Sequence, residues 1–129
     1  MDDYEDWRKQ VRLLLQMRRE WEVTCEVSDG LEAVQKAGEL KPDSILLDIG
    51  LPKLNGIEAA RQIRQLSSSS KIIFLSQDNS LDIVKEALST GAHGYVHKAH
   101  VQTDLLPAID AVLRGEQFLI NGSKNLRVP

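Results

Sequence analysis

Residues 45–48, Ile45-Leu46-Leu47-Asp48, form a short apolar run that ends on a carboxylate. A second apolar run, Lys71 to Leu75, ends at Ser76, and a third stretch, Gly94 to His97, is followed by Lys98. Short runs of this kind are typical of parallel strands covered by helices on both faces. Since functional side chains of open parallel sheets gather at the carboxyl ends of the strands, we expect the side chains of Asp48, Ser76 and Lys98 to converge.

Helical periods separate these runs. Apolar residues at three- and four-residue steps predict helices over Glu5–Arg19, Leu31–Leu40, Ile57–Leu66, Leu81–Ser89 and Asp104–Arg114. Ser28-Asp29-Gly30 predicts a turn and a helix N-cap. The segment Glu22–Val27 alternates charged and apolar residues, which predicts a strand with one wetter face and Cys25 as a small filler. Alternating strands and helices indicate an α/β fold with a doubly wound parallel sheet.

The composition is that of one ordinary globular domain. The 129 residues are 42% hydrophobic and 27% charged, with a net charge of -3, which argues against a nucleic-acid-binding surface. The single cysteine, Cys25, cannot form an intramolecular disulfide, and no run reaches the length of a membrane span. We expect a cytoplasmic protein with no membrane contact. His93, His97 and His100 have no ligand spacing and are expected to be surface residues.

The start of the chain carries two further carboxylates that could join Asp48. If Asp2, Asp3 and Asp48 lie close together, they repel one another unless a divalent cation holds them, and Mg²⁺ suits such an all-oxygen site. A carboxylate beside that cation can attack phosphorus and become an acyl phosphate. The hydroxyl of Ser76 and the ammonium of Lys98 can then donate to the phosphoryl oxygens.

The motifs resemble the receiver domains of two-component response regulators. Asp3 and Asp48 are 45 residues apart, Asp48 and Ser76 are 28 apart, and Ser76 and Lys98 are 22 apart. The matching strings are Ser28-Asp29-Gly30-Leu31-Glu32-Ala33, Ile45 to Pro52, Asn55-Gly56, Glu58-Ala59-Ala60 and Gly91 to Lys98. The resemblance runs from Asp2 to about Leu119, and it implies a flavodoxin-like (CheY-like) fold.

The resemblance assigns the acidic residues. Asp48 would be the phosphoacceptor, phosphorylated by a histidine kinase. Asp2 and Asp3 would bind Mg²⁺ together with Asp48 and the backbone carbonyl of Gly50.

The resemblance also implies a switch. Ser76 would be the hydroxyl switch residue, Lys98 would contact the phosphoryl group, and Tyr95 would be the aromatic that turns inward on activation. The surface that changes would span roughly residues 81–114. Its partner would be a protein, such as a second copy of the chain or another regulator.

The residues of these motifs, and the segment Val112 to Leu119 that follows the last predicted helix, most resemble the NarL/LuxR-type branch. In that branch a DNA-binding helix-turn-helix follows the receiver. We expect a receiver domain over residues 1–119 and a tail or linker remnant over 120–129, without that helix-turn-helix and without nucleic-acid binding by this chain.

The first strand of the family pattern is truncated here. A receiver opens with about five apolar residues before the acidic pair, whereas only Met1 precedes Asp2. Five buried aliphatic side chains, at about 1.5–3 kcal/mol each, correspond to roughly 10 kcal/mol. Three explanations are open: a start upstream, a neighbouring chain or segment in the slot, or a degenerate relic.

These residues are compatible with three functions. The first is a phosphorylation-driven signalling module, which is not an enzyme in the usual sense. The second is a pseudo-receiver that binds proteins without phosphorylation. The third is a hydrolase with Asp48 as nucleophile, which is disfavoured because Gly50 stands where a general acid would be needed.

Trp7 and Trp21 are expected to cover the ends of the first helix.

Overall fold

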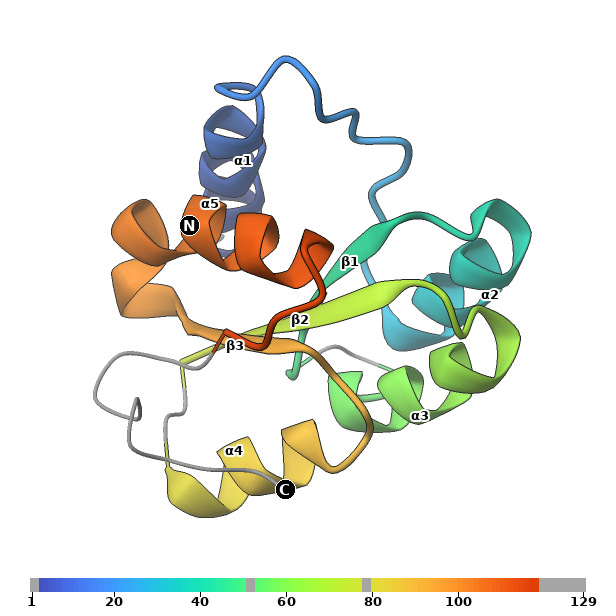
Figure 1. The fold of residues 1–129 in the computed structure, drawn as a ribbon. Coiled ribbons are helices and arrows are strands. Elements are labelled where there is room, and N and C mark those ends of the chain that lie inside the picture. The colour runs from blue at the N-terminus through green and yellow to red at the C-terminus, as the bar shows by residue number, and fades with distance from the viewer. Residues whose placement is uncertain (1–2, 51–52, 78–79, 119–129) are drawn as a thin grey trace.

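The computed structural model describes residues 3–50, 53–77 and 80–118, with side chains from residue 7 onward. Three strands and five α-helices alternate along the described chain, and a short 3-10 helix precedes the last of them (Figure 1). In order, they are α1 (Asp3–Leu15), α2 (Gly30–Leu40), β1 (Ser44–Asp48), α3 (Gly56–Leu66), β2 (Lys71–Ser76), α4 (Leu81–Leu88), β3 (Gly94–His97), η1 (Lys98–His100) and α5 (Val101–Leu113). The predicted α/β fold is confirmed.

The three strands form one parallel sheet in the order β1-β2-β3. Asp48 is the register partner of Leu75, and Ser76 is the register partner of His97. Ser76 therefore comes one residue after the partner of Asp48, and Lys98 comes one residue after the partner of Ser76. The carboxyl ends of all three strands lie at the same edge of the sheet.

Helices cover both faces of the sheet, as the short apolar runs predicted (Figure 1). On one face, α2, α3 and α4 pack against Leu47, Ile72 and Phe74. On the other face, α1 and α5 pack against Ile73, Leu75 and Val96. The alternation of neighbouring side chains between these two clusters is the two-residue period of a strand buried on both faces.

Polar side chains fix the starts of three helices. Asp29 accepts a hydrogen bond from the backbone N–H of Glu32, so the predicted cap of α2 is confirmed. Asn55 caps α3 and Ser80 caps α4 in the same way. Each cap satisfies one of the N–H groups that a helix leaves unpaired in its first turn.

The predicted strand over Glu22–Val27 is wrong. These residues have no strand pairing, and residues 22–26 are exposed, including Cys25, which is not a buried filler. An alternating sequence can form a strand only beside a free strand edge, and the nearest described strand, β1, is separated from this segment by a cleft. The first helix also ends earlier than predicted, at Leu15.

The cleft lies along the outer edge of β1. It has a volume of about 640 Å³ and is lined by α1, residues 20–27, α2, β1 and the end of α5. β1 is only half-buried over Ser44–Leu46, whereas β2 is buried over five of its six residues. β1 is therefore the edge strand of the described sheet on this side.

Two contacts hold the segments that follow α1 and α5 against the rest of the fold. Arg18, just after α1, makes a bidentate ion pair with Asp110 of α5, with N–O distances of 2.9 and 2.7 Å. After α5 the chain returns to β3, where Phe118 exchanges backbone hydrogen bonds with His93 and Tyr95.

The predicted tail over 120–129 lies outside the described residues. In the part of the chain that is described, no helix has the length and apolar character needed to span a membrane.

Candidate functional site

Asp48, Ser76 and Lys98 come together at the carboxyl edge of the sheet. Asp48 is the last residue of β1, Ser76 is the last of β2, and Lys98 directly follows β3. The parallel register places these three ends side by side. The predicted convergence of the strand ends is therefore present.

The carboxylate of Asp48 is held from two sides. Its Oδ1 accepts a hydrogen bond of 2.9 Å from the backbone N–H of Gly50, and its Oδ2 lies 2.5 Å from the Nζ atom of Lys98. The Asp48 and Lys98 side chains are 17% and 16% exposed. An ion pair this far out of water is screened less than a surface pair, yet the carboxylate still reaches solvent.

The start of α3 lies directly against Asp48. The N–H of Gly56 donates to the carbonyl oxygen of Ile49 at 2.8 Å, and Asn55 caps the helix that begins there. A Cβ atom at position 56 would lie 2.3 Å from the carbonyl oxygen of Asp48. Only glycine fits this approach, so the Asn55-Gly56 motif fixes the backbone behind the carboxylate.

The side chains of Ser76 and Tyr95 are buried near the carboxyl edge of the sheet. Ser76 is 5% exposed, and Tyr95 is fully buried, with its ring centroid 6.4 Å from that of Phe74. Tyr95 is thus already inward in this structure. The change of its position on activation stays a prediction.

The predicted metal ligands are only partly described. Asp2 lies outside the described residues, and Asp3 is the first residue of α1, with its side chain not described. Gly50 contacts Asp48 through its N–H group, while the role of its carbonyl stays a prediction. Among the side chains that are described, no three His, Cys, Asp or Glu residues gather as a metal site.

Trp7 is a site residue that the sequence reasoning missed. Its ring lies under the ammonium of Lys98, with the Nζ atom 4.9 Å from the ring centroid. Trp7 also packs against the cluster formed by α1, α5 and the sheet. From the sequence, Trp7 was expected only to cover one end of the first helix, because a helical pattern does not show which strand end a side chain will meet.

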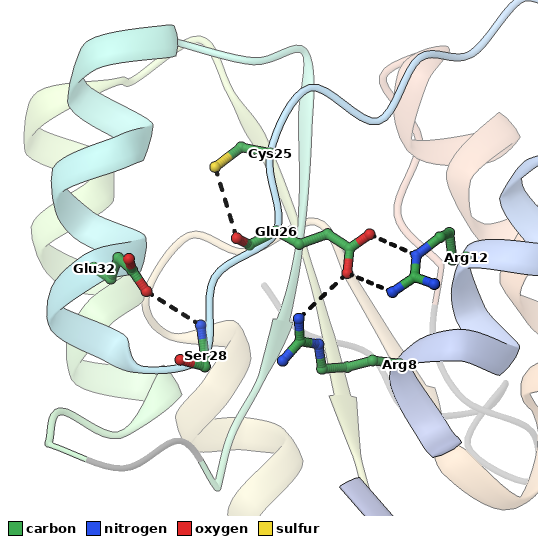
Figure 2. Close-up of polar contacts among 6 residues, drawn as sticks. All are labelled: Arg8, Arg12, Cys25, Glu26, Ser28 and Glu32. Carbon is green, nitrogen blue, oxygen red and sulfur yellow. Dashed lines mark hydrogen bonds and ion pairs between the residues drawn. The ribbon is translucent and has the colours of Figure 1, made fainter. Parts of the chain in front are cut away.

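Glu26 ties the segment before α2 to α1 (Figure 2). Its carboxylate accepts from Arg12 at 2.7 and 3.1 Å and from Arg8 at 3.4 Å. The hydrogen bond from Arg12 is the main cause that lowers the pKa of Glu26 below its ordinary value. These ion pairs hold residues 20–27, which line the cleft, near α1, although no strand forms there.

The histidines form no ligand set in the described part of the chain. The Nδ1 atom of His97 accepts a hydrogen bond from the N–H of Ala99, and the rings of His97 and His100 are 5.6 Å apart. His93 is half-buried, and its Nδ1 has no hydrogen-bond partner among the described residues. Burial lowers the pKa of His93 below its ordinary value. The half-buried ring differs from the surface histidine expected at this position.

Comparison with known families identifies the family to which this fold belongs. The response regulator receiver domain family matches residues 1–110. The chain belongs to this family. The receiver domain is 36% identical over 119 residues to the nitrate/nitrite response regulator NarL of Escherichia coli K12, a match that covers 92% of this chain and 55% of that protein. The chain spans about half the length of the curated relatives it matches.

Solved structures agree with this assignment. A LuxR-family response regulator from Aurantimonas sp. SI85-9A1 is 33% identical, with a TM-score of 0.85 over 91% of this chain and 84% of that one. The isolated receiver domain of RcsB from Salmonella enterica serovar Typhimurium, solved in the presence of the phosphomimetic BeF₃⁻, is 25% identical, with a TM-score of 0.81 over 92% of this chain and 88% of that one. The predicted resemblance to the NarL/LuxR-type branch is confirmed.

Proposed function

We propose that this receiver domain accepts a phosphoryl group on Asp48 from the phosphohistidine of a histidine kinase and changes its protein contacts in response. The observation that carries the proposal is the contact of the Asp48 carboxylate with Lys98 at the carboxyl edge of the sheet. A buried structural ion pair would explain the contact as well, but Asp48 also reaches solvent and stands beside Ser76.

The proposed transfer is a displacement at phosphorus. A carboxylate oxygen of Asp48 forms the new O–P bond while the P–N bond of the phosphohistidine breaks. The electron pair of that bond returns to the imidazole nitrogen, which takes up a proton from solvent. The products are an acyl phosphate on Asp48 and a neutral histidine on the kinase. Since Asp48 is itself modified, we propose a switch and not an enzyme that turns over a separate substrate.

The residues around Asp48 are suited to this step. The N–H of Gly50 fixes one carboxylate oxygen, so the carboxylate keeps one orientation. The Lys98 ammonium lies beside the Asp48 carboxylate, so it could stabilise the negative charge that would develop on the phosphoryl oxygens. Ser76, one position beyond the register partner of Asp48, can supply a hydroxyl donor to the same group.

The donor chemistry at Asp48 fits magnesium. Receiver domains generally bind Mg²⁺ at an acidic site. Here the ligands would be the carboxylates of Asp2, Asp3 and Asp48 and the carbonyl of Gly50, all of them the oxygen donors that Mg²⁺ prefers. Bound there, Mg²⁺ would neutralise charge on the transferred phosphoryl group.

The proposed output is a change of surface around α4, β3 and α5. A phosphoryl group on Asp48 would attract the Ser76 hydroxyl, and Tyr95 lies on the strand next to β2. Such a local charge change can shift an equilibrium between two packings. The proposed partners are the kinase, a second copy of the domain or another regulator.

The test is the intact mass of the protein after incubation with Mg²⁺ and acetyl phosphate. We expect wild type to gain the mass of one phosphoryl group and Asp48→Asn to gain none. Asp82→Asn, at an exposed position of α4, is the matched control and should gain the group like wild type. A folded wild-type protein that gains nothing would contradict the proposal and favour a receiver that binds without phosphorylation.

A further inference from the structure

Trp7 and Asp48 contact the same ammonium group. The Nζ atom of Lys98 lies 2.5 Å from the Oδ2 atom of Asp48 and 4.9 Å from the centroid of the Trp7 ring. Asp48 and Lys98 come from the ends of two strands, whereas Trp7 belongs to α1. One cation therefore connects the first helix to the phosphoacceptor.

The indole replaces water around the ammonium. A Lys ammonium is strongly hydrated and sits on a flexible four-carbon stem, so it can occupy many positions. Here the Lys98 side chain is only 16% exposed, because a carboxylate and an aromatic ring occupy part of its surroundings. Trp offers the strongest cation–π attraction of the aromatic side chains within about 6 Å.

Packing fixes the ring itself. Trp7 is half-buried in the cluster that also contains Val96 and Val101, which flank Lys98 in the sequence. The ring and the lysine stem are thus anchored in the same cluster. The other tryptophan, Trp21, has a different cation as its neighbour: its ring centroid lies 4.8 Å from the guanidinium of Arg18, which pairs with Asp110.

We propose that Trp7 is a positioning residue for phosphotransfer at Asp48: its ring holds the ammonium of Lys98 beside the carboxylate. This inference rests on the proposed function. Before transfer the ammonium would pair with Asp48, and after transfer it would meet the phosphoryl oxygens at nearly the same place. A plain packing role for Trp7 needs only apolar bulk, whereas the positioning role also requires a π face.

Three variants separate these two roles. Trp7→Leu keeps apolar bulk and removes the π face, Trp7→Phe keeps a weaker π face, and Trp21→Leu is the matched control at the other tryptophan. The first readout is the NMR resonance of the Lys98 ε-methylene protons in the unphosphorylated protein. Ring currents should shift it upfield in wild type, less in Trp7→Phe and not in Trp7→Leu, while Trp21→Leu should resemble wild type.

The second readout is the rate of phosphorylation by acetyl phosphate, followed by intact mass with melting curves as the folding check. We expect Trp7→Leu to react about two- to fivefold more slowly than wild type, the factor that a cation–π contact of ordinary strength corresponds to, with Trp7→Phe in between. If Trp7→Leu does not fold, the comparison of wild type with Trp7→Phe tests the inference, with a rate below that of wild type expected for Trp7→Phe.

A Lys98 resonance that is the same in wild type and Trp7→Phe, or a folded Trp7→Leu that reacts at the wild-type rate, would overturn the inference. If wild type takes up no phosphate, the proposed function fails and the positioning role with it. In that case the resonance still shows whether the ring holds the ammonium, so the two failures are distinguishable.

Discussion

Gly56 lies against the backbone of Asp48, closer than any other residue type could. A Cβ atom at position 56 would stand 2.3 Å from the Asp48 carbonyl oxygen and 2.7 Å from the Cα of Ile49. Both obstacles are backbone atoms, which cannot rotate away as the end of a flexible side chain can. The position of the candidate phosphoacceptor therefore depends on the absence of a side chain at the start of α3.

Gly56→Ala should destabilise the domain and slow phosphorylation of Asp48. The added methyl forces α3 and the Asp48–Ile49 backbone apart, and overpacking of this kind costs about 1–3 kcal/mol. Denaturant unfolding measures the free energy of unfolding. The matched control is Gly38→Ala inside α2, where the new Cβ meets only ordinary contacts at 3.6 Å and helix propensity favours alanine. Equal losses of stability in the two variants would contradict this explanation.

Lys98→Met should slow phosphorylation of Asp48 by about 100-fold, the effect of removing one donor aimed at developing charge. Methionine keeps the length of the side chain but removes the ammonium that lies 2.5 Å from Asp48. The rate of mass gain with acetyl phosphate measures the effect. Lys85→Met, at an exposed position of α4, should react like wild type. A wild-type rate in Lys98→Met would mean that the ion pair is only structural.

The Arg18–Asp110 pair should make stability depend on acid pH. Hydrogen bonds from Arg18 lower the pKa of Asp110 in the folded state. The stabilisation is therefore fully present above the unfolded-state pKa, about 3.9, and is lost as the pH falls through the lower folded-state pKa. Wild type should be more stable than Asp110→Asn at pH 7, and the two should converge in strong acid.

Melting curves across this pH range measure the difference. The double variant Arg18→Gln/Asp110→Asn should follow the same pH course as Asp110→Asn, because either change already removes the pair. A difference between wild type and Asp110→Asn that stays constant down to strong acid would show that the carboxylate does not gain its stability from Arg18.

Neighbouring amides of β1 should differ in hydrogen exchange. The N–H of Ile49 donates to Leu75, and the carbonyl of Asp43 accepts from Lys71, so the odd-numbered residues of this stretch face β2. The backbone groups of Leu46 consequently face the cleft, whereas those of Leu47 face β2. We expect the Leu46 amide to exchange much faster than the Leu47 amide in NMR-detected exchange. Equal protection would mean that another segment pairs with this edge.

The convergence of Asp48, Ser76 and Lys98 could be predicted from the sequence because it needs only short apolar runs and the parallel order of α/β folds. Each of these residues ends or follows a strand, and the structure places them as expected. The Asn55-Gly56 motif was visible in the sequence as well. Its close approach to Asp48 was not, because it depends on how α3 packs onto the loop after β1.

Two features could not be predicted, for different physical reasons. The alternation in Glu22–Val27 is a local pattern, and a strand also needs a free neighbouring edge at hydrogen-bonding distance. Here ion pairs to Glu26 hold the segment near α1 instead (Figure 2). Trp7 lies on the apolar stripe of α1, and its contact with Lys98 depends on the docking of that helix, which the stripe leaves open.

The most direct test of the account is to locate the phosphoryl group. Protein treated with Mg²⁺ and acetyl phosphate is reduced with borohydride, which converts an aspartyl phosphate to homoserine, and is then sequenced by tandem mass spectrometry. The account predicts homoserine at position 48 in wild type and at no position in Asp48→Asn. Homoserine at another aspartate, or none in a folded wild-type protein, would contradict the assignment of Asp48 as the phosphoacceptor.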